Sequence, residues 1–319
     1  MPARPAAQPV PNPAATSLAR NVIDQLSKVI LGKELQLQLA LTCLISRGHL
    51  LIEDLPGVGK TTLAQALARV LGLSFQRVQF TSDMLPADII GVSVYERNSG
   101  EFRFHKGPVF AQLVLADEVN RATAKTQSSL LEAMEEYQVT VDGQTYALPQ
   151  PFFVVATQNP AHQIGTFPLP ESQLDRFLMS MSLGYPPASL ERTLISGADR
   201  REILDGLEPS LALDDFIALQ RLAPKVHLSD PILDYIQAIV AYTRQSPEFD
   251  AGLSPRAAIA LGRAAQAWAL IQGHRGVLPE DVQAVAPAVV GHRLRHRDQT
   301  AGLTTTELGE TVIGAVAIP

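Results

Sequence analysis

A short polar loop joins two apolar segments in the first quarter of the chain. In LLIEDLPGVGKTT, residues 50–62, a strand-like run precedes the loop and a helical pattern follows it. A loop of this kind suits phosphate, because its backbone N–H groups and the dipole of the following helix attract anions. Gly57 and Gly59 let the backbone approach the anion closely. Lys60 would reach the β- and γ-phosphates of a nucleotide, and the Thr61 hydroxyl would ligate Mg²⁺.

The loop departs from the strict phosphate-loop pattern at one position. The pattern G-x-x-x-x-G-K-[ST] begins with glycine, and this chain has Asp54 there. An ordinary strand-to-helix turn with a surface lysine is the alternative interpretation. The strand before the loop and the helix after it favour the phosphate site.

Two adjacent carboxylates offer the metal ligand and the base that such a site needs. Asp117 and Glu118 follow an apolar run at 113–116, and ligand sites of parallel sheets collect at the carboxyl ends of the strands. Asp117 would hold Mg²⁺, directly or through water, and Glu118 would orient and deprotonate the attacking water. Without the phosphate loop upstream, the solvated start of a loop would explain the pair better.

Two more polar residues lie beside strand-like segments. Asn159 follows the apolar run FFVVATQ and would hydrogen-bond the γ-phosphate or the attacking water, unless the segment is a routine turn. Arg176, in LPESQLDRF, precedes a strand far along the sequence from the loop. An arginine there would serve the phosphates of another subunit. A salt bridge to nearby Asp175 or Glu171 is the alternative.

Composition limits the class of protein. The 319 residues are 46% hydrophobic and 18% charged, which supports a large core and about two domains. The net charge of −6 gives no overall basic footprint for nucleic acid. The single cysteine, Cys43, cannot form an intrachain disulfide, so a reducing, cytoplasmic compartment fits best.

The first 17 residues contain five prolines and almost no large apolar side chain, which predicts a disordered tail rather than a signal peptide. No apolar run approaches the ~18 residues that a membrane span requires.

Apolar runs alternating with helical patterns predict a mostly parallel sheet with helices on both faces. The pattern of residues 18–47 predicts two helices that are separated by a break at residues 31–33. After residue 186 strand signals nearly vanish, which predicts a smaller all-α domain. The strands are expected at 49–53, 75–80, 112–116, 152–156 and 177–182, and the helices between them at 60–71 and 123–136. The later helices are expected at 188–204, 213–222, 230–244, 255–272 and 280–290.

Two alternating segments predict β-hairpins that the parallel sheet does not need. VSVYERNSGEFRFHKG, residues 92–107, alternates about Asn98-Ser99-Gly100, and QVTVDGQTYAL, residues 138–148, alternates about Asp142-Gly143. Taken alone, each is better explained as a decorated loop.

Several stretches, in this order, resemble the AAA+ ATPases and, more narrowly, the MoxR family. They are LPGVGKTTLA, QFTSDMLPADIIG, GPVFAQLVLADEVNRATAKTQSSLLEAMEE, QVTVDG, ATQNP, LPESQLDRF and LSPRA. The resemblance is dense from about 50 to 180 and returns at 253–257. It implies an αβα sandwich with a mostly parallel five-stranded sheet at 18–186, followed by an α-helical lid at 187–319.

The resemblance also implies a role for each matched residue. The loop corresponds to Walker A, and Asp117 and Glu118 to Walker B. Asn159 falls at sensor 1, Arg176 at the arginine finger and Arg256 at sensor 2, while the break at 29–32 flanks the adenine. The hairpins correspond to the helix-2 insert, about 85–107, and the pre-sensor-1 hairpin, about 137–149. The expected nucleotide-binding residues are Ile30, Leu31, Gly32, Pro56, Gly57, Val58, Gly59, Lys60, Thr61, Thr62, Asp117, Asn159 and Arg256; the expected catalytic residues are Lys60, Glu118, Asn159 and Arg176.

The function implied by the resemblance is a Mg²⁺-dependent ATPase that forms a hexameric ring and remodels a protein client, often beside a partner with a von Willebrand A domain. Stable nucleic-acid binding is not expected. One alternative is a nucleic-acid motor, because related ring helicases share both hairpins, but the acidic chain weighs against it. The other is a nucleotide-gated scaffold with little turnover, against which Asp117, Glu118 and Asn159 weigh.

Two histidines lie in a basic string, and a separate arginine follows the carboxylate pair. His292 and His296 are four residues apart, as in a zinc site on a helix, but the string GHRLRHR favours a solvated or interface-facing basic helix end. Arg121 either meets a neighbouring subunit or caps a helix.

Overall fold

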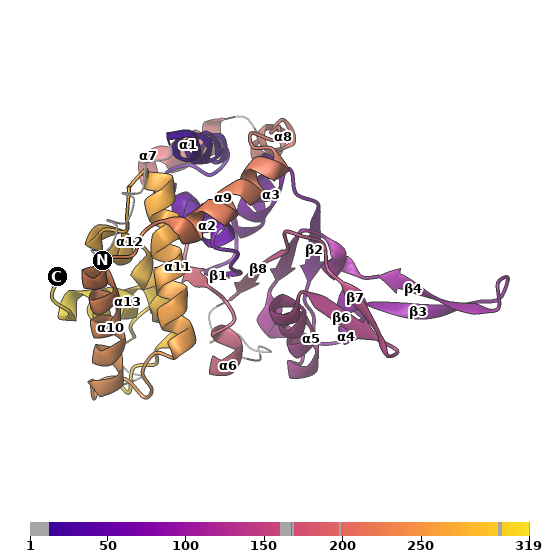
Figure 1. The fold of residues 1–319 in the computed structure, drawn as a ribbon. Coiled ribbons are helices and arrows are strands. Elements are labelled where there is room, and N and C mark those ends of the chain that lie inside the picture. Colours follow the sequence, from indigo (N-terminus) through magenta and orange to yellow (C-terminus); the bar gives the residue numbers. More distant parts are fainter. Residues whose placement is uncertain (1–12, 160–166, 168, 198, 299–301, 319) are drawn as a thin grey trace, which may run out of the picture.

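A parallel sheet forms the centre of the molecule. A computed structural model describes residues 13–159, 167, 169–197, 199–298 and 302–318. Five strands pair in parallel in the order β2-β5-β8-β1-β9 (Figure 1). They are β1 Leu50–Glu53, β2 Phe75–Gln79, β5 Leu113–Asp117, β8 Phe153–Gln158 and β9 Met179–Met181. The predicted fold class, a five-stranded parallel sheet with a helical domain after it, is therefore confirmed.

Alternate side chains of each central strand enter two different cores. In β5, Leu113 and Leu115 join the core that contains the helical half of the molecule, while Val114 and Ala116 face the core beneath the hairpins. Successive side chains of a strand point to opposite faces, so a strand covered on both faces must be apolar throughout. This requirement explains why the sequence shows continuous apolar runs here rather than alternation.

Three helices lie on one side of the sheet. They are α1 Pro13–Ser27, α2 Glu34–Ile45 and α3 Lys60–Val70. Helices α2 and α3 pack against the sheet, and α1 packs on these two helices. The prediction of a disordered tail as far as residue 17 is wrong for residues 13–17, since α1 begins at Pro13; residues 1–12 lie outside the described part. Proline is well tolerated in the first turn of a helix, and the small side chains of Ala15 and Ala19 pack fully into the core.

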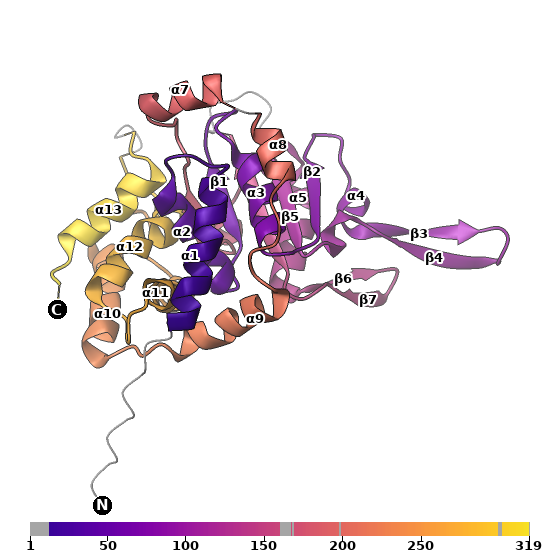
Figure 2. The same cartoon turned by 90° about the horizontal axis from the view of Figure 1, so that it is seen from above.

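Two hairpins project from the end of the molecule opposite the helical region (Figures 1 and 2). The first follows α4 Pro86–Ile90 and pairs β3 Gly91–Glu96 with β4 Glu101–Lys106; the second pairs β6 Gln138–Val141 with β7 Gln144–Ala147. Gly91 has a φ of +103°, and a Cβ there would lie 2.3 Å from the His105 carbonyl oxygen. The rings of Phe104 and Tyr146 stack with centroids 4.1 Å apart, which joins the hairpins to each other. Helix α5, Ala124–Glu136, precedes the second hairpin.

Helices dominate the chain after β9, as expected. They are α7 Ala188–Ser196, α8 Arg200–Asp205, α9 Leu213–Leu222, α10 Asp230–Gln245, α11 Pro255–Gln272, α12 Pro279–Val290 and α13 Thr305–Ala315, and the short α6 Glu171–Leu174 precedes β9. Three-residue 3₁₀ turns lie at Pro108–Phe110, Val119–Arg121, Ala223–Lys225 and Gly291–Arg293.

Two details of this helical region differ from the expectation. The helix expected over 188–204 is two helices, because Gly197 ends α7 with an extended backbone. Helix α13 was not expected at all, although Thr304 and Glu307 form a capping box that marks its start in the sequence. The core of this region is continuous with that of α1 to α3. The domain boundary near residue 186 stays a prediction.

Candidate nucleotide-binding site

The loop between β1 and α3 has the backbone shape that the phosphate hypothesis requires. Gly57 and Gly59 have φ angles of +85° and +96°, a region that side chains other than glycine rarely adopt. A Cβ on Gly57 would meet no atom within 4 Å, so conformation rather than space explains this glycine. Helix α3 begins at Lys60 directly after the loop, so its unpaired N–H groups and dipole lie at the loop.

The Lys60 ammonium group turns back onto the loop. Its Nζ donates to the carbonyl oxygens of Asp54 at 2.6 Å and Leu55 at 3.0 Å. Burial lowers the pKa of Lys60, while the negative charges of Asp54, Asp117 and Glu118 oppose that shift. The lysine is therefore a cation that the loop itself holds beside the carboxylates.

Asp54 occupies the position of the usual first glycine of the loop, and its side chain makes hydrogen bonds that glycine could not make. The buried Asp54 carboxylate accepts hydrogen bonds from the Ser182 hydroxyl at 2.9 Å and from the backbone N–H groups of Leu183 and Gly184, both at 2.7 Å. Its other oxygen accepts from the N–H of Leu55. Asp54 thus ties the end of β1 to the segment that leaves β9.

Asp117 is held by a hydroxyl and a guanidinium group. The Thr157 hydroxyl donates to Oδ1 of Asp117 at 2.6 Å, and Arg77 donates to Oδ2 from Nη2 at 2.6 Å and from Nε at 3.1 Å. Arg77 also reaches the side chain of Gln79 at 2.9 Å. Sequence reasoning missed Arg77, because only the strand order reveals that β2 lies beside β5.

Glu118 lies between an asparagine and an arginine. Its backbone is left-handed, with a φ of +56°. Asn159 Nδ2 donates to Oε1 at 3.1 Å, and Arg121 Nε lies 2.8 Å from Oε2. Asn159 is 4% exposed, and its carbonyl oxygen accepts from Asn120. The structure therefore brings the expected base and Asn159 together, and it places Arg121 in an ion pair within its own chain.

These side chains surround one cavity of about 340 Å³ at the carboxyl end of the sheet. Phosphate-loop glycines, one lysine, one arginine, threonine hydroxyls, two carboxylates and two amides line it together, and this donor set suits a triphosphate with a divalent metal. The lining residues are Pro56, Gly57, Gly59, Lys60, Thr61, Thr62, Arg77, Gln79, Asp117, Glu118 and Asn159.

The segment expected to flank the adenine lies close to the loop. Ile30 is buried, and its Cδ1 is 4.0 Å from the position of a Cβ built on Gly59. Gly32 has a φ of +67°, and a Cβ there would lie 2.5 Å from Leu190 Cδ1, so Gly32 lets α7 approach. Among the described residues, Val58 and residues 30–32 do not line the cavity; Val58 packs against the core.

Arg176 and Arg256 lie elsewhere. Neither is among the described residues that line the nucleotide cavity. Both bind Glu135 near the end of α5: Arg176 Nη2 lies 3.0 Å from Oε2, and Arg256 Nη2 lies 2.7 Å from Oε1. Asp175 and Glu171, the partners weighed for Arg176, pair instead with Arg293 and Arg295. The two arginines therefore form one cluster, and their catalytic roles stay predictions.

The basic string near residue 292 differs from the expected solvated or interface-facing helix end at its first two basic residues, whereas Arg295 and Arg297 are exposed. His292 is buried, with Nε2 3.1 Å from the Phe177 carbonyl oxygen, and burial holds its pKa well below the usual value. Arg293 is also held inside, by Asp175 at 2.7 Å. Residues Gly291–Arg293 form a 3₁₀ turn from which His292 and Arg293 face inward, in place of an α-helix. The four-residue spacing of His292 and His296 therefore does not place the two side chains on one helix face. Within the described ranges, no three His, Cys, Asp or Glu residues gather as a metal site.

No helix in the described part of the chain has the length and apolar character that crossing a membrane requires.

Comparison with known proteins agrees with this geometry. Residues 49–179 match the family model described as "ATPase family associated with various cellular activities (AAA)", and residues 241–311 match an AAA lid domain. The uncharacterized protein YeaC of Bacillus subtilis is 45% identical over 95% of both chains. The chaperone MoxR1 of Mycobacterium tuberculosis is 40% identical over 85% of this chain and 74% of its own length. A crystal structure of a Cytophaga hutchinsonii protein assigned as an ATPase has a TM-score of 0.85 and 37% identity, with 96% of each chain covered.

Proposed function

Because the chain belongs to the MoxR family of AAA+ ATPases, we propose that its polar cavity hydrolyses ATP to ADP and phosphate with Mg²⁺. The observation that carries this proposal is the meeting of Lys60, Asp117, Glu118 and Asn159 around one cavity at the start of α3. These four residues come from three separate segments of the chain, and each lies at the end of a strand or the start of a helix.

Each residue has one task in this proposal. Lys60 leaves the loop carbonyls and binds the β- and γ-phosphates, whose negative charge replaces two neutral acceptors. Glu118 takes a proton from the attacking water, and the amide of Asn159 orients that carboxylate. The short Asn159–Glu118 contact of 3.1 Å supports this pairing.

Thr61 and Asp117 are the residues that would hold Mg²⁺. Both line the cavity, and hydroxyl and carboxylate oxygens are the ligands that this ion prefers. When bound, Mg²⁺ supplies positive charge that stabilises the developing charge on the phosphate oxygens.

The larger assembly is part of the same proposal. We infer a ring, hexameric by the family resemblance, in which Arg176 and Arg256 face the nucleotide of the next subunit. Their absence from the lining of their own cavity and their common site on Glu135 support this placement. The ring remodels a protein client in the cytoplasm, beside a partner with a von Willebrand A domain. A relative named as a chaperone supports the remodelling role.

Two variants test the proposed chemistry. Lys60→Ala loses tight ATP binding in a direct titration, while Lys28→Ala, at an exposed lysine outside the cavity, binds like the parent. Glu118→Gln binds ATP but stops releasing phosphate at steady state, because the amide keeps the shape of the carboxylate and cannot take a proton. Glu132→Gln, an exposed change on α5, is the matched control. Unchanged ATP affinity in Lys60→Ala, or parental turnover in Glu118→Gln, would overturn the assignment.

A further inference from the structure

Two helices end in an unusual way beside the same cavity. Helix α2 is followed by Arg47 and α5 by Tyr137, with φ angles of +58° and +53°. The left-handed residue that closes a helix is usually glycine, because a side chain is strained there. Of the four described non-glycine residues with positive φ, Glu118 belongs to the nucleotide site and Asp142 to a hairpin turn. The remaining two, Arg47 and Tyr137, face each other across a cavity.

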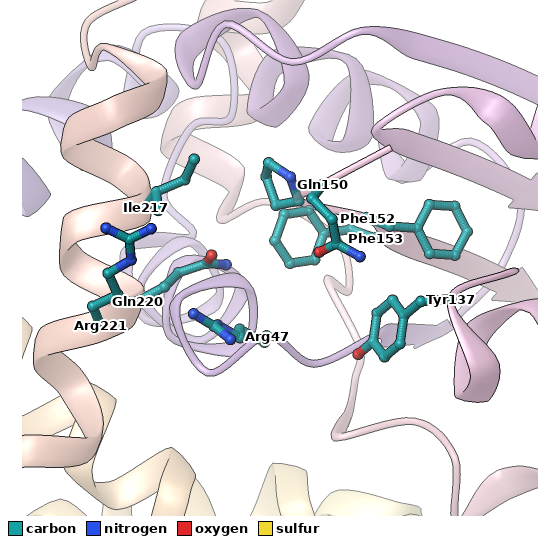
Figure 3. Close-up of a pocket in the computed structure, with 9 residues that line it drawn as sticks. Arg47, Tyr137, Gln150, Phe152, Phe153, Ile217, Gln220 and Arg221 are labelled. Atoms are coloured by element: carbon teal, nitrogen blue, oxygen red, sulfur yellow. The ribbon is translucent and has the colours of Figure 1, made fainter. Parts of the chain in front are cut away.

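That cavity has a volume of about 440 Å³ and a basic and an aromatic side. Figure 3 shows Arg47, Gln220 and Arg221 on one side and Tyr137 and Phe152 on the other. The first group comes from the turn after α2 and from α9, and the second from the turn after α5 and the segment before β8. A ligand held here would contact guanidinium groups and the half-buried ring of Tyr137 together.

A second cavity of about 570 Å³ continues from the first. It shares Arg47, Tyr137 and Arg221 with the first and adds Lys225 and Arg263. We name the two cavities together the α2–α9 groove. Burial raises the pKa of Tyr137, and the nearby charges of Arg47 and Arg263 oppose that shift, which agrees with their convergence.

Positive charge predominates in the groove. Among the described residues, no Asp or Glu lines either of its two cavities, whereas the adjoining cavity that shares Arg47 and Arg263 also contains Glu135 and Asp175. None of the ion pairs in the described part involves Arg47, Arg221, Lys225 or Arg263. The whole chain has a net charge of −6, so four unpaired cations in one groove run against its overall composition.

We propose that the α2–α9 groove docks an acidic peptide segment of a partner protein. Carboxylates of the segment pair with Arg47 and Arg221, since guanidinium groups bind carboxylates through two parallel hydrogen bonds. An apolar side chain of the segment packs between Tyr137 and Ile217. The two cavities, of about 440 and 570 Å³, offer more space than one small anion fills, which suits a peptide segment.

Nucleic acid fits the groove less well. Single strands bind to exposed aromatic rings on which bases stack, and Phe152 and Phe153 are only 2% and 1% exposed. The acidic chain also repels a long polyanion. The proposal concerns an interaction surface whose two cavities share no described lining residue with the nucleotide cavity.

The test measures fluorescence anisotropy with a labelled pool of peptides made from Glu, Asp, Phe and Leu, and with a matched pool in which Lys replaces the acids. The parent protein binds the acidic pool and not the basic one. Arg47→Gly and Arg221→Gln each weaken binding by about tenfold or more, because each removes a charge-assisted contact. Arg20→Gln, at an exposed arginine on α1, binds like the parent.

Stability and activity distinguish docking from a structural role. Arg47→Gly melts no lower than the parent, because glycine suits the left-handed position. Arg221→Gln keeps the ATPase rate of the parent, because Arg221 does not line the cavity that contains Arg176 and Arg256. The proposal is overturned if the acidic pool does not bind or if the groove variants bind it like the parent. It is also overturned if a single-stranded oligothymidylate binds more tightly than the acidic pool and loses that binding in the same variants.

Discussion

The buried carboxylate of Asp117 depends on Arg77, a residue of the neighbouring strand. Arg77→Ala leaves that carboxylate with the Thr157 hydroxyl and with Lys60 as its remaining nearby cation. Because the Arg77 side chain is 47% exposed, solvent weakens the pair, and we expect a loss of about 1–2 kcal/mol in the free energy of unfolding. Urea denaturation measures it. Arg77→Lys keeps the charge with a single donor group, so its free energy of unfolding should lie between those of the parent and Arg77→Ala. If Arg77→Ala unfolds at the same urea concentration as the parent, Asp117 does not depend on Arg77.

His49 makes the fold sensitive to acid. Its Nδ1 accepts from the N–H of Val154 at 3.0 Å and its Nε2 lies 3.1 Å from the Met134 carbonyl oxygen, so the folded protein holds the ring neutral. Burial lowers the pKa of His49 from 6.5 to about 4. The unfolded chain therefore binds the proton first, and stability present above pH 6.5 is lost as the pH falls toward 4.

The size of this effect is on the order of 3 kcal/mol for His49. Denaturation at a series of pH values between 7.5 and 4 measures it, and an NMR titration of the His49 ring confirms the assignment. A His49 ring that titrates near 6.5 in the folded protein contradicts it.

Sequence patterns located the residues that follow strands, because a polar side chain after an apolar run is visible without the fold. Asp117, Glu118 and Asn159 are of this kind, and Lys60 was located by the glycine loop before it. The role of Arg77 was not predicted, because its ion pair with Asp117 depends on β2 lying beside β5. The burial of His292 was missed for a similar reason, since a basic string gives no sign of the carbonyl group of Phe177 that it meets.

At the scale of elements, Asp54 connects the phosphate loop to the exit from β9. Asp54→Gly restores the usual loop residue but removes the acceptor for Ser182, Leu183 and Gly184. Three backbone N–H groups lose their partner, because Leu55 also donates to this carboxylate, so we expect a loss of about 2–3 kcal/mol in the free energy of unfolding. Denaturation against Asp54→Asn, which keeps one acceptor oxygen, isolates the carboxylate. A glycine variant as stable as the parent would show that the junction does not depend on it.

The predicted elements succeeded where periodicity was strong and failed where it was not. The helices expected at 213–222 and 255–272 were found with those bounds. Helix α13 was missed because glycine and threonine dilute its apolar pattern, and α1 was placed late because its first buried residues are alanines. Each failure came from small side chains, whose burial is decided by the neighbouring helices.

At the scale of the whole molecule, the candidate catalytic residues fall into two groups. One group surrounds the cavity at the carboxyl end of the sheet, and the other, Arg176 and Arg256, shares Glu135. A single chain does not bring the two groups around one cavity. A ring does so if each subunit offers its arginines to the next, and catalysis then requires an interface rather than a subunit.

Mixing two inactive variants tests this account most directly. Arg176→Ala keeps the base Glu118 and should bind ATP like the parent but hydrolyse it on the order of 10³-fold more slowly, because an arginine that stabilises the transferred phosphate carries a factor of that size. Glu118→Gln keeps the arginine and lacks the base. Co-purification of differently tagged subunits establishes that mixed rings form. The account predicts that mixed rings recover part of the parental phosphate release, since some interfaces then pair an intact Glu118 with an intact Arg176. Mixed rings that form and release no phosphate would contradict it, and Arg176 would then serve only the salt bridge to Glu135 within its own chain.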